Sequence, residues 1–368
     1  MGERMPRQPV EIYPLSKVQA AKVLVVGCGA VGANAFLALV LSGFRHIALM
    51  DFDTLEPSNC SRAAGLFRPE DAGQKKTEIL KAWAEGFMPG MLIQTYAMDV
   101  TDVGALFAGR FDAVICAVDN ARAVLHIARI TAEAGVPVLR GATNGFNASV
   151  EAVKNQDGAC LGCYKKDGAL SEGCGVKYQK AILSQQAPAC QVSSALAANR
   201  IVRELILLLT EGVAERRIYE SAQGALYTSE LRRDPDCPNH EGGSIPESTS
   251  LPGTCEETTL AQLLQITGGE ALLLEDPLVT ETICRCGKHR KITIPLRHVQ
   301  ESDLHGCGCA AASLAPERCV THSLLGTSSE AGLLETSLAA LGVRRCALLP
   351  VVYATGEIRH FNFAEDMR

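Results

Sequence analysis

Three glycines near the amino terminus are spaced for binding phosphate. They are Gly27, Gly29 and Gly32 of GCGAVG, which follows the apolar run KVLVVG (22–27) and opens a helical pattern. Glycines at such a junction allow a tight turn and let backbone N–H groups at a helix N-terminus approach an anion. Nicotinamide-dependent oxidoreductases share this pattern, so it indicates a nucleotide without deciding the chemistry.

Charged and amide side chains follow in an order that suits a triphosphate. The stretches are DFDTLEPSNCSR (51–62), GQKK (73–76) and AVDNAR (117–122). Cations neutralise charge that develops on phosphates, and a carboxylate can hold magnesium. A dehydrogenase would use Asp51 for a ribose hydroxyl, but it does not need the Asn, Arg and Lys that follow. These residues favour an enzyme that attacks a triphosphate.

The stretches VLVVGCGAVG, DFDTLEPSNCSR, GQKK and AVDN, in this order, resemble the ThiF/MoeB/HesA family of adenylyltransferases, relatives of ubiquitin-activating enzymes. The resemblance covers about residues 20–240. It implies that ATP and magnesium are bound. By its positions, Asp51 would bind the ribose, Asp119 would hold magnesium, and the phosphates would be contacted by Asn59, Arg62 and Lys76 (rather than Lys75). Of these, Arg62, Lys76 and Asp119 would also act in catalysis.

Two departures from the family pattern stand out. Ala63 occupies the position after the arginine, where the family usually has glutamine. The family's N-terminal arginine, which reaches a neighbouring subunit's site, has only Arg4 and Arg7 as loose candidates.

Two pairs of metal-ligand residues lie far apart in the sequence. Cys160 and Cys163 form CLGC, and Cys237 and His240 form CPNH. A half-site of two ligands needs a second pair, and the resemblance places that pair just after a β-rich segment, as here. Four protein ligands would make the implied zinc structural and not catalytic. Histidine as the fourth ligand departs from the commoner all-cysteine pattern, and an exposed loop histidine is the alternative.

A second zinc site is a weaker expectation. Its ligands would be two close pairs with one residue between members, Cys284 with Cys286 and Cys307 with Cys309. Small buried thiols are the alternative reading.

Cys190 stands just before a long predicted helix, residues 193–211. A helix N-terminus stabilises a thiolate, so this position favours reactivity. In relatives that form thioesters with ubiquitin-like proteins, the catalytic cysteine precedes the equivalent helix, which makes Cys190 the first choice for a nucleophile. Cys174 is the second choice, and a structural thiol in an enzyme that stops at the adenylate is the third reading.

The elements that position these residues are strands alternating with helices. Such apolar runs separated by helices predict an α/β fold with a Rossmann-like, doubly wound, mostly parallel sheet. The predicted strands are 22–27, 46–51, 92–98, 112–118 and 136–142, with 147–153 as a further candidate.

The domain boundaries follow from composition. Residues 1–244 would form the adenylation domain, with a crossover loop at about 160–190. The linker would be 245–254, within a Gly-, Ser- and Pro-rich stretch. Residues 255–368 would form a small Cys-rich α+β domain.

Composition excludes several function classes. The chain has 368 residues, is 47% hydrophobic and carries a net charge of −6 without a basic patch, so we expect no nucleic-acid partner. No apolar run predicts a membrane span or signal peptide, so we expect a cytoplasmic protein with reduced thiols.

Together these features predict a ubiquitin-like-protein activating enzyme. ATP would adenylate the C-terminal carboxylate of a small protein, Cys190 would take the acyl group as a thioester, and a conjugating-type enzyme would receive it. The family is usually homodimeric, so we expect a dimer. The rival readings are a sulfur-carrier-protein adenylyltransferase of the thiamine or molybdopterin type and a non-catalytic scaffold that binds a ubiquitin-like protein.

Overall fold

The computed structural model describes residues 12–63, 65–155, 158–163, 190–214, 216–240, 245–283, 288–299, 303 and 319–366. The chain divides into two compact units. The first comprises Met1–Thr101 and Ala108–Ile245, and the second comprises Asp102–Phe107 and Pro246–Arg368.

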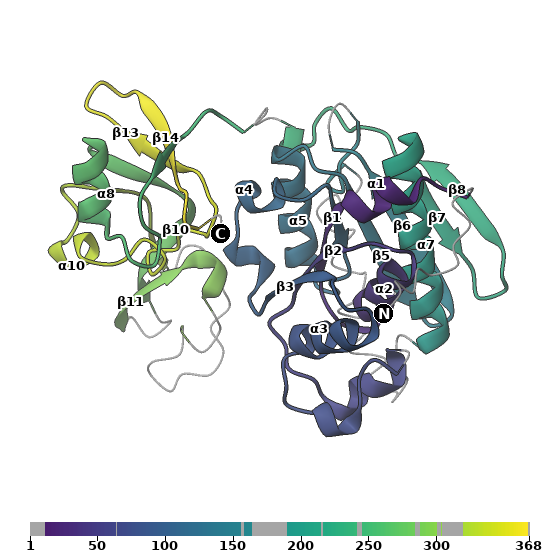
Figure 1. The fold of residues 1–368 in the computed structure, drawn as a ribbon. Coiled ribbons are helices and arrows are strands. Elements are labelled where there is room, and N and C mark those ends of the chain that lie inside the picture. Colours follow the sequence, from purple (N-terminus) through teal and green to yellow (C-terminus); the bar gives the residue numbers. More distant parts are fainter. Residues whose placement is uncertain are drawn as a thin grey trace. The chain divides into compact units, whose positions relative to one another are not determined.

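The first unit is built on an eight-stranded sheet of order β3-β2-β1-β4-β5-β6-β7-β8 (Figure 1). The first five strands in this order are mutually parallel, and the last three are antiparallel to their neighbours. The parallel strands are β1 (Lys22–Val26), β2 (His46–Met50), β3 (Leu92–Tyr96), β4 (Ala113–Cys116) and β5 (Val138–Asn144). The antiparallel strands are β6 (Asn147–Val153), β7 (Arg216–Glu220) and β8 (Leu226–Glu230). The predicted α/β fold with a mostly parallel sheet is confirmed.

The helices and short 3₁₀ turns up to Ile245 precede, separate or follow these strands in the sequence. They are α1 (Leu15–Ala20), α2 (Ala30–Leu41), α3 (Lys76–Phe87), α4 (Ala105–Ala108), α5 (Ala121–Glu133), α7 (Gln191–Glu211), η1 (Pro57–Arg62), η2 (Pro69–Asp71), η3 (Val100–Asp102) and η4 (Pro238–His240). Most of α4 and the last residue of η3 belong to the second unit. The predicted helix 193–211 is therefore confirmed, and α1 was not predicted.

The main core of the first unit lies between the sheet and helices α2, α3 and α7. Val23 and Val25 of β1 face this core, while Leu24 and Val26 are buried on the other side of the sheet. Both faces of the parallel strands are therefore covered, which explains their continuous apolar sequence. β1 lies between β2 and β4, so strand order reverses there, and ligands of such sheets bind at the carboxyl ends of the strands flanking this point.

The second unit is built on a separate six-stranded sheet. Its path is β11-β10-β13-β14-β9, and β12 also pairs with β10. The elements are β9 (Thr249–Leu251), α8 (Leu260–Thr267), β10 (Ala271–Ile283), β11 (His289–Pro295), η5 (Leu296–His298), β12 (Cys319–Gly326), α10 (Ala331–Leu334), β13 (Leu349–Val352) and β14 (Ile358–Phe363).

The stretch 245–254 is not only a linker. It contains β9, which pairs in parallel with β14, so its Ser- and Pro-rich composition did not reveal that its backbone completes a sheet. The unit's own core is formed mainly by leucines, among them Leu263, Leu272 and Leu349. Within the described residues, no helix has the length and apolarity needed to cross a membrane.

Candidate functional site

The glycine loop turns sharply between β1 and α2. Gly27 has a φ of +87° and donates its N–H to the carbonyl of Met50, at 2.9 Å. Gly29 is the N-cap of α2. A Cβ on Gly32 would lie 1.7 Å from the Gly27 oxygen, so only glycine fits there. The loop and the first turn of α2 thus hold backbone N–H groups at a helix N-terminus, the arrangement that binds phosphate.

Asp51 follows β2 and is held against the glycine loop. Its Oδ2 accepts the N–H of Cys28 at 2.6 Å, and its Oδ1 accepts the N–H of Asp53 at 2.8 Å. Burial raises the pKa of the Asp51 carboxyl, although both backbone bonds and the charge of Lys76 oppose this rise. The carboxylate is therefore fixed beside the loop, where a ribose hydroxyl would lie.

Lys76 is the buried lysine of the GQKK stretch. It begins α3, its side chain is 8% exposed, and its Nζ lies 2.8 Å from Oδ2 of Asp53. Lys75 instead donates its Nζ to the carbonyl of Phe52, at 2.6 Å. The two neighbouring lysines thus have different environments, and Lys76 is the one whose charge acts on Asp51.

Asn59 and Arg62 lie on η1, and Asp119 lies beyond β4. Asn59 accepts the backbone N–H of Glu56 at 3.2 Å, and the carbonyl of Arg62 accepts the side-chain amide of Asn34 at 2.9 Å. Asp119 is exposed, two residues after Ala117, which packs against Gly27.

The structure thus gathers the predicted nucleotide residues near the carboxyl ends of β1, β2 and β4. Ala63, which replaces the usual glutamine, is fully buried.

Cys190 is the N-cap of α7 and is partly exposed. Its Sγ lies 3.4 Å from Oγ of Ser193. Hydrogen bonds from Ser193, first from its hydroxyl and then from its backbone, lower the pKa of the Cys190 thiol. Cys28, by contrast, is fully buried, and burial raises the pKa of its thiol. Of these two thiols, Cys190 has the surroundings of a nucleophile.

The two predicted pairs of metal ligands come together. Sγ of Cys160 lies 3.7 Å from Sγ of Cys163 and 3.6 Å from Sγ of Cys237, and Nε2 of His240 lies 3.1 Å from Sγ of Cys163. Tetrahedral zinc with bonds of ~2.3 Å separates two sulfurs by about 3.8 Å. The four ligand atoms all lie within 4.8 Å of one another, so this cluster could hold a metal ion.

The surroundings of the cluster suit thiolates bound to a cation. The pKa of Cys160 is raised to about 12, chiefly by burial and also by the neighbouring thiols Cys163 and Cys237, although a hydrogen bond from Asn239 opposes this rise. The N–H of Gly162 also points at Sγ of Cys160, at 3.2 Å. These N–H donors would orient the ligand sulfur as outer-shell partners do. Cys174 and the pairs Cys284/Cys286 and Cys307/Cys309 lie outside the described residues.

The ThiF family model matches residues 7–239. This chain belongs to the ThiF family. Two curated relatives are SUMO-activating enzyme subunit 2 of Dictyostelium discoideum, 33% identical over 149 residues, and the NEDD8-activating enzyme E1 catalytic subunit of Caenorhabditis elegans, 30% identical over 159 residues. Each match covers 40% of this chain. The chain spans only 22% and 37% of the length of these relatives.

Solved structures of Escherichia coli MccB share the fold. The complex with MccA-N7isoAsn has a TM-score of 0.52 at 22% identity, covering 61% of this chain and 68% of that chain. The complex with ATP has a TM-score of 0.51 at 20% identity, with the same coverage of both chains. At these identities the likeness shows the fold alone.

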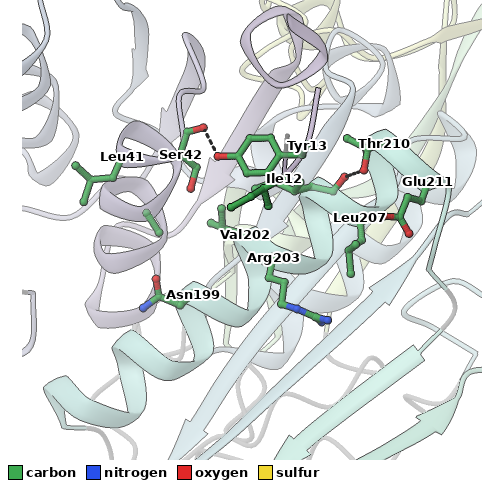
Figure 2. Close-up of a pocket in the computed structure, with 12 residues that line it drawn as sticks. Ile12, Tyr13, Leu41, Ser42, Asn199, Val202, Arg203, Leu207, Thr210 and Glu211 are labelled. Atoms are coloured by element: carbon green, nitrogen blue, oxygen red, sulfur yellow. Dashed lines mark hydrogen bonds between the residues drawn. The ribbon is translucent and has the colours of Figure 1, made fainter. Parts of the chain in front are cut away.

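A separate groove of about 460 Å³ runs between α2 and α7 (Figure 2). It is lined by apolar side chains such as Leu41 and Val202, and Tyr13 crosses it to donate its hydroxyl to the carbonyl of Ser42, at 3.1 Å. None of the nucleotide, thiol or cluster residues lines it, so it is no part of the ThiF-type site.

Sequence reasoning missed two residues of the site. Asn34 and Gln191 share side-chain hydrogen bonds beside Arg62 and Cys190. A single polar residue in the apolar sequence of α2 was the available signal for Asn34.

Proposed function

We propose that this protein activates the C-terminal carboxylate of a ubiquitin-like protein with ATP and then carries the acyl group on Cys190. The main support is that a partly exposed thiol with a lowered pKa begins the helix that is hydrogen-bonded to α2, the helix of the glycine loop. Asp51 and Lys76 lie near the carboxyl ends of the parallel strands, beside the glycine loop. The relatives that activate SUMO and NEDD8 favour a protein substrate.

The first step is adenylation. A carboxylate oxygen attacks the α-phosphorus of ATP, and the bond between the α- and β-phosphates breaks to release pyrophosphate. The loop of Gly27, Gly29 and Gly32 would hold phosphates with its N–H groups, and Asp51 would accept a ribose hydroxyl. The side chains that would screen the phosphates or hold magnesium are Asn59, Arg62, Lys76 and Asp119.

The second step is thioester formation. The thiolate of Cys190 attacks the acyl carbon, a C–S bond forms, and the C–O bond to the phosphate breaks so that AMP leaves. The hydrogen bonds from Ser193 lower the pKa of Cys190 and so favour the thiolate that attacks. The thiol of a conjugating-type enzyme would then take the acyl group.

The remaining assignments concern the setting of this chemistry. We assign a structural zinc ion to Cys160, Cys163, Cys237 and His240, since four protein ligands leave no open position. A homodimer in the cytoplasm is our working assembly.

ATP–pyrophosphate exchange tests the first step, with a purified ubiquitin-like protein as the substrate. Lys76→Ala should slow exchange about 100-fold, because one buried cation at the phosphates is lost. Lys75→Ala is the matched control, since its Nζ bonds to a backbone carbonyl. Equal loss in both variants would contradict the assigned role of Lys76.

A non-reducing gel tests the second step. An adduct that thiols cleave, present in the wild type and missing in Cys190→Ala, would support the two-step enzyme. Exchange without an adduct in either protein would favour the rival, a sulfur-carrier-protein adenylyltransferase that stops at the adenylate. Binding of the small protein without exchange would favour a scaffold.

A further inference from the structure

The apolar helix α2 contains one polar side chain, Asn34, and it is 4% exposed. A buried amide costs free energy unless its donor and acceptor atoms find partners. The partners of Asn34 therefore show why an amide is present in an otherwise apolar helix.

Asn34 bonds to two segments outside its own helix. Its Nδ2 donates to the carbonyl of Arg62 at 2.9 Å, and its Oδ1 accepts Nε2 of Gln191, also at 2.9 Å. Nδ2 also donates to the carbonyl of Ala30, one turn back in α2, at 2.7 Å. Gln191 is the first residue of α7 and follows Cys190 directly. One buried amide thus connects the segment of Arg62 with the helix that begins at the thiol.

We propose that Asn34 is a positioning residue that couples nucleotide binding to the reactivity of Cys190. This coupling rests on the proposed function, in which Arg62 contacts the phosphates. When the phosphates hold Arg62, its carbonyl is held as well, and the amides of Asn34 and Gln191 are fixed in turn. The first turn of α7 is then ordered around the sulfur of Cys190, which makes the thiolate more available.

The competing explanation is that Asn34 only satisfies its own polar atoms. Its replacement would then lower stability, but a nucleotide would act on Cys190 to the same extent with or without it. The decisive quantity is therefore the ratio of Cys190 reactivity with and without nucleotide, since a purely structural role does not change this ratio.

The experiment measures the rate at which iodoacetamide alkylates Cys190 at pH 7, by mass spectrometry of its peptide, with and without saturating ATP and magnesium. In the wild type, the nucleotide should raise this rate about fivefold, within the usual range of coupling between sites. Asn34→Leu and Gln191→Leu should each bring the ratio to about 1. The double variant should match either single variant, because both remove one shared interaction.

Asn199→Leu is the matched control. Asn199 is an exposed residue of α7 that donates its Nδ2 to the carbonyl of Ala195 at 2.8 Å, the same one-turn bond that Asn34 makes to Ala30. This variant loses a similar bond without separating two segments, so the wild-type ratio should persist. Circular dichroism confirms that each variant is folded before alkylation.

The outcomes separate the two proposals. An unchanged or lower rate with ATP in the wild type, or a wild-type ratio in Asn34→Leu, overturns the coupling while adenylation stands. A fivefold ratio that depends on Asn34, without any thioester on Cys190, supports the coupling and refutes the thioester step. A melting temperature unmoved by ATP means that no nucleotide binds, and both proposals fail.

Discussion

The cysteines on the two sides of residues 164–189 have opposite surroundings, which shift the thiol pKa in opposite directions. Before this stretch, Cys160 and Cys163 are buried among other ligand atoms, and burial is the main cause that raises the pKa of Cys160, to about 12. After it, Cys190 is partly exposed, and hydrogen bonds from Ser193 lower its pKa. The difference teaches that position, and not residue type, separates a thiol suited to a cation from one suited to attack.

The largest expected effect is the loss of metal binding and stability when a cysteine of the cluster is replaced. Cys237→Ala should abolish metal binding and lower the melting temperature by about 10 °C, because metal-binding free energy is folding free energy and each kcal/mol is worth roughly 2–4 °C in a domain of this size. Elemental analysis and calorimetry measure the two quantities. Cys190→Ala is the control and should change neither. A similar loss in both variants would end the distinction between the two sets.

A smaller effect concerns the pH dependence of Cys190. Because its pKa is lowered, the thiolate forms below the pH at which an ordinary cysteine titrates, and the alkylation rate should rise correspondingly early. Ser193→Ala should move the midpoint of this rise upward and slow alkylation at pH 7 by about threefold, since one pKa unit is worth tenfold in thiolate. Rates of iodoacetamide alkylation from pH 5 to about 10 give the midpoint.

The matched control for this titration is Ser194→Ala. Ser194 is the next residue of the same helix turn and is also buried, but its hydroxyl has no partner among the described residues. The midpoint should stay where it is in the wild type. If the midpoint shifted as much in Ser194→Ala as in Ser193→Ala, the lowered pKa of Cys190 would be an effect of the helix N-terminus and not of the Ser193 hydroxyl.

The smallest expected effect concerns Asn239, which contacts a sulfur of the cluster. Nδ2 of Asn239 lies 3.5 Å from Sγ of Cys160 and lowers its pKa. Asn239→Ala should weaken metal binding about tenfold, as losses of outer-shell partners do, and lower the melting temperature by about 3 °C. Competition with a chromophoric chelator measures the affinity. A variant that binds metal as tightly as the wild type would show that this amide only fills space against Gly162.

Local sequence patterns predicted much of the first unit. The apolar runs that became β1, β2 and β4 are buried on both faces, so their composition alone identified them. The glycine spacing was readable because Gly32 cannot carry a side chain beneath Gly27. The metal-ligand pairs could be matched across 77 residues because ligand spacing is itself a local pattern.

Contacts between distant segments were not predictable in the same way. Asn34 and Gln191 are 157 positions apart, and neither belongs to a pattern that names the other. The strand β9 was missed because backbone pairing with β14 overrides a composition typical of linkers. The pairs Cys284/Cys286 and Cys307/Cys309 remain predictions, as does the zinc ion they would share.

The antiparallel strand β6 separates the cysteine cluster from the glycine loop, and this affects how the yield of folded protein would depend on zinc. β6 runs antiparallel to β5, so it leads the chain away from the carboxyl ends of the parallel strands, where the glycine loop lies, and toward their amino ends. There Asn155 donates its Nδ2 to the carbonyl of Val136 at 2.6 Å. Cys160 follows five residues later. A batch from zinc-poor medium should therefore contain fewer folded molecules, while each folded molecule keeps its affinity for ATP. Yield would vary with metal supply, and KM for ATP would not.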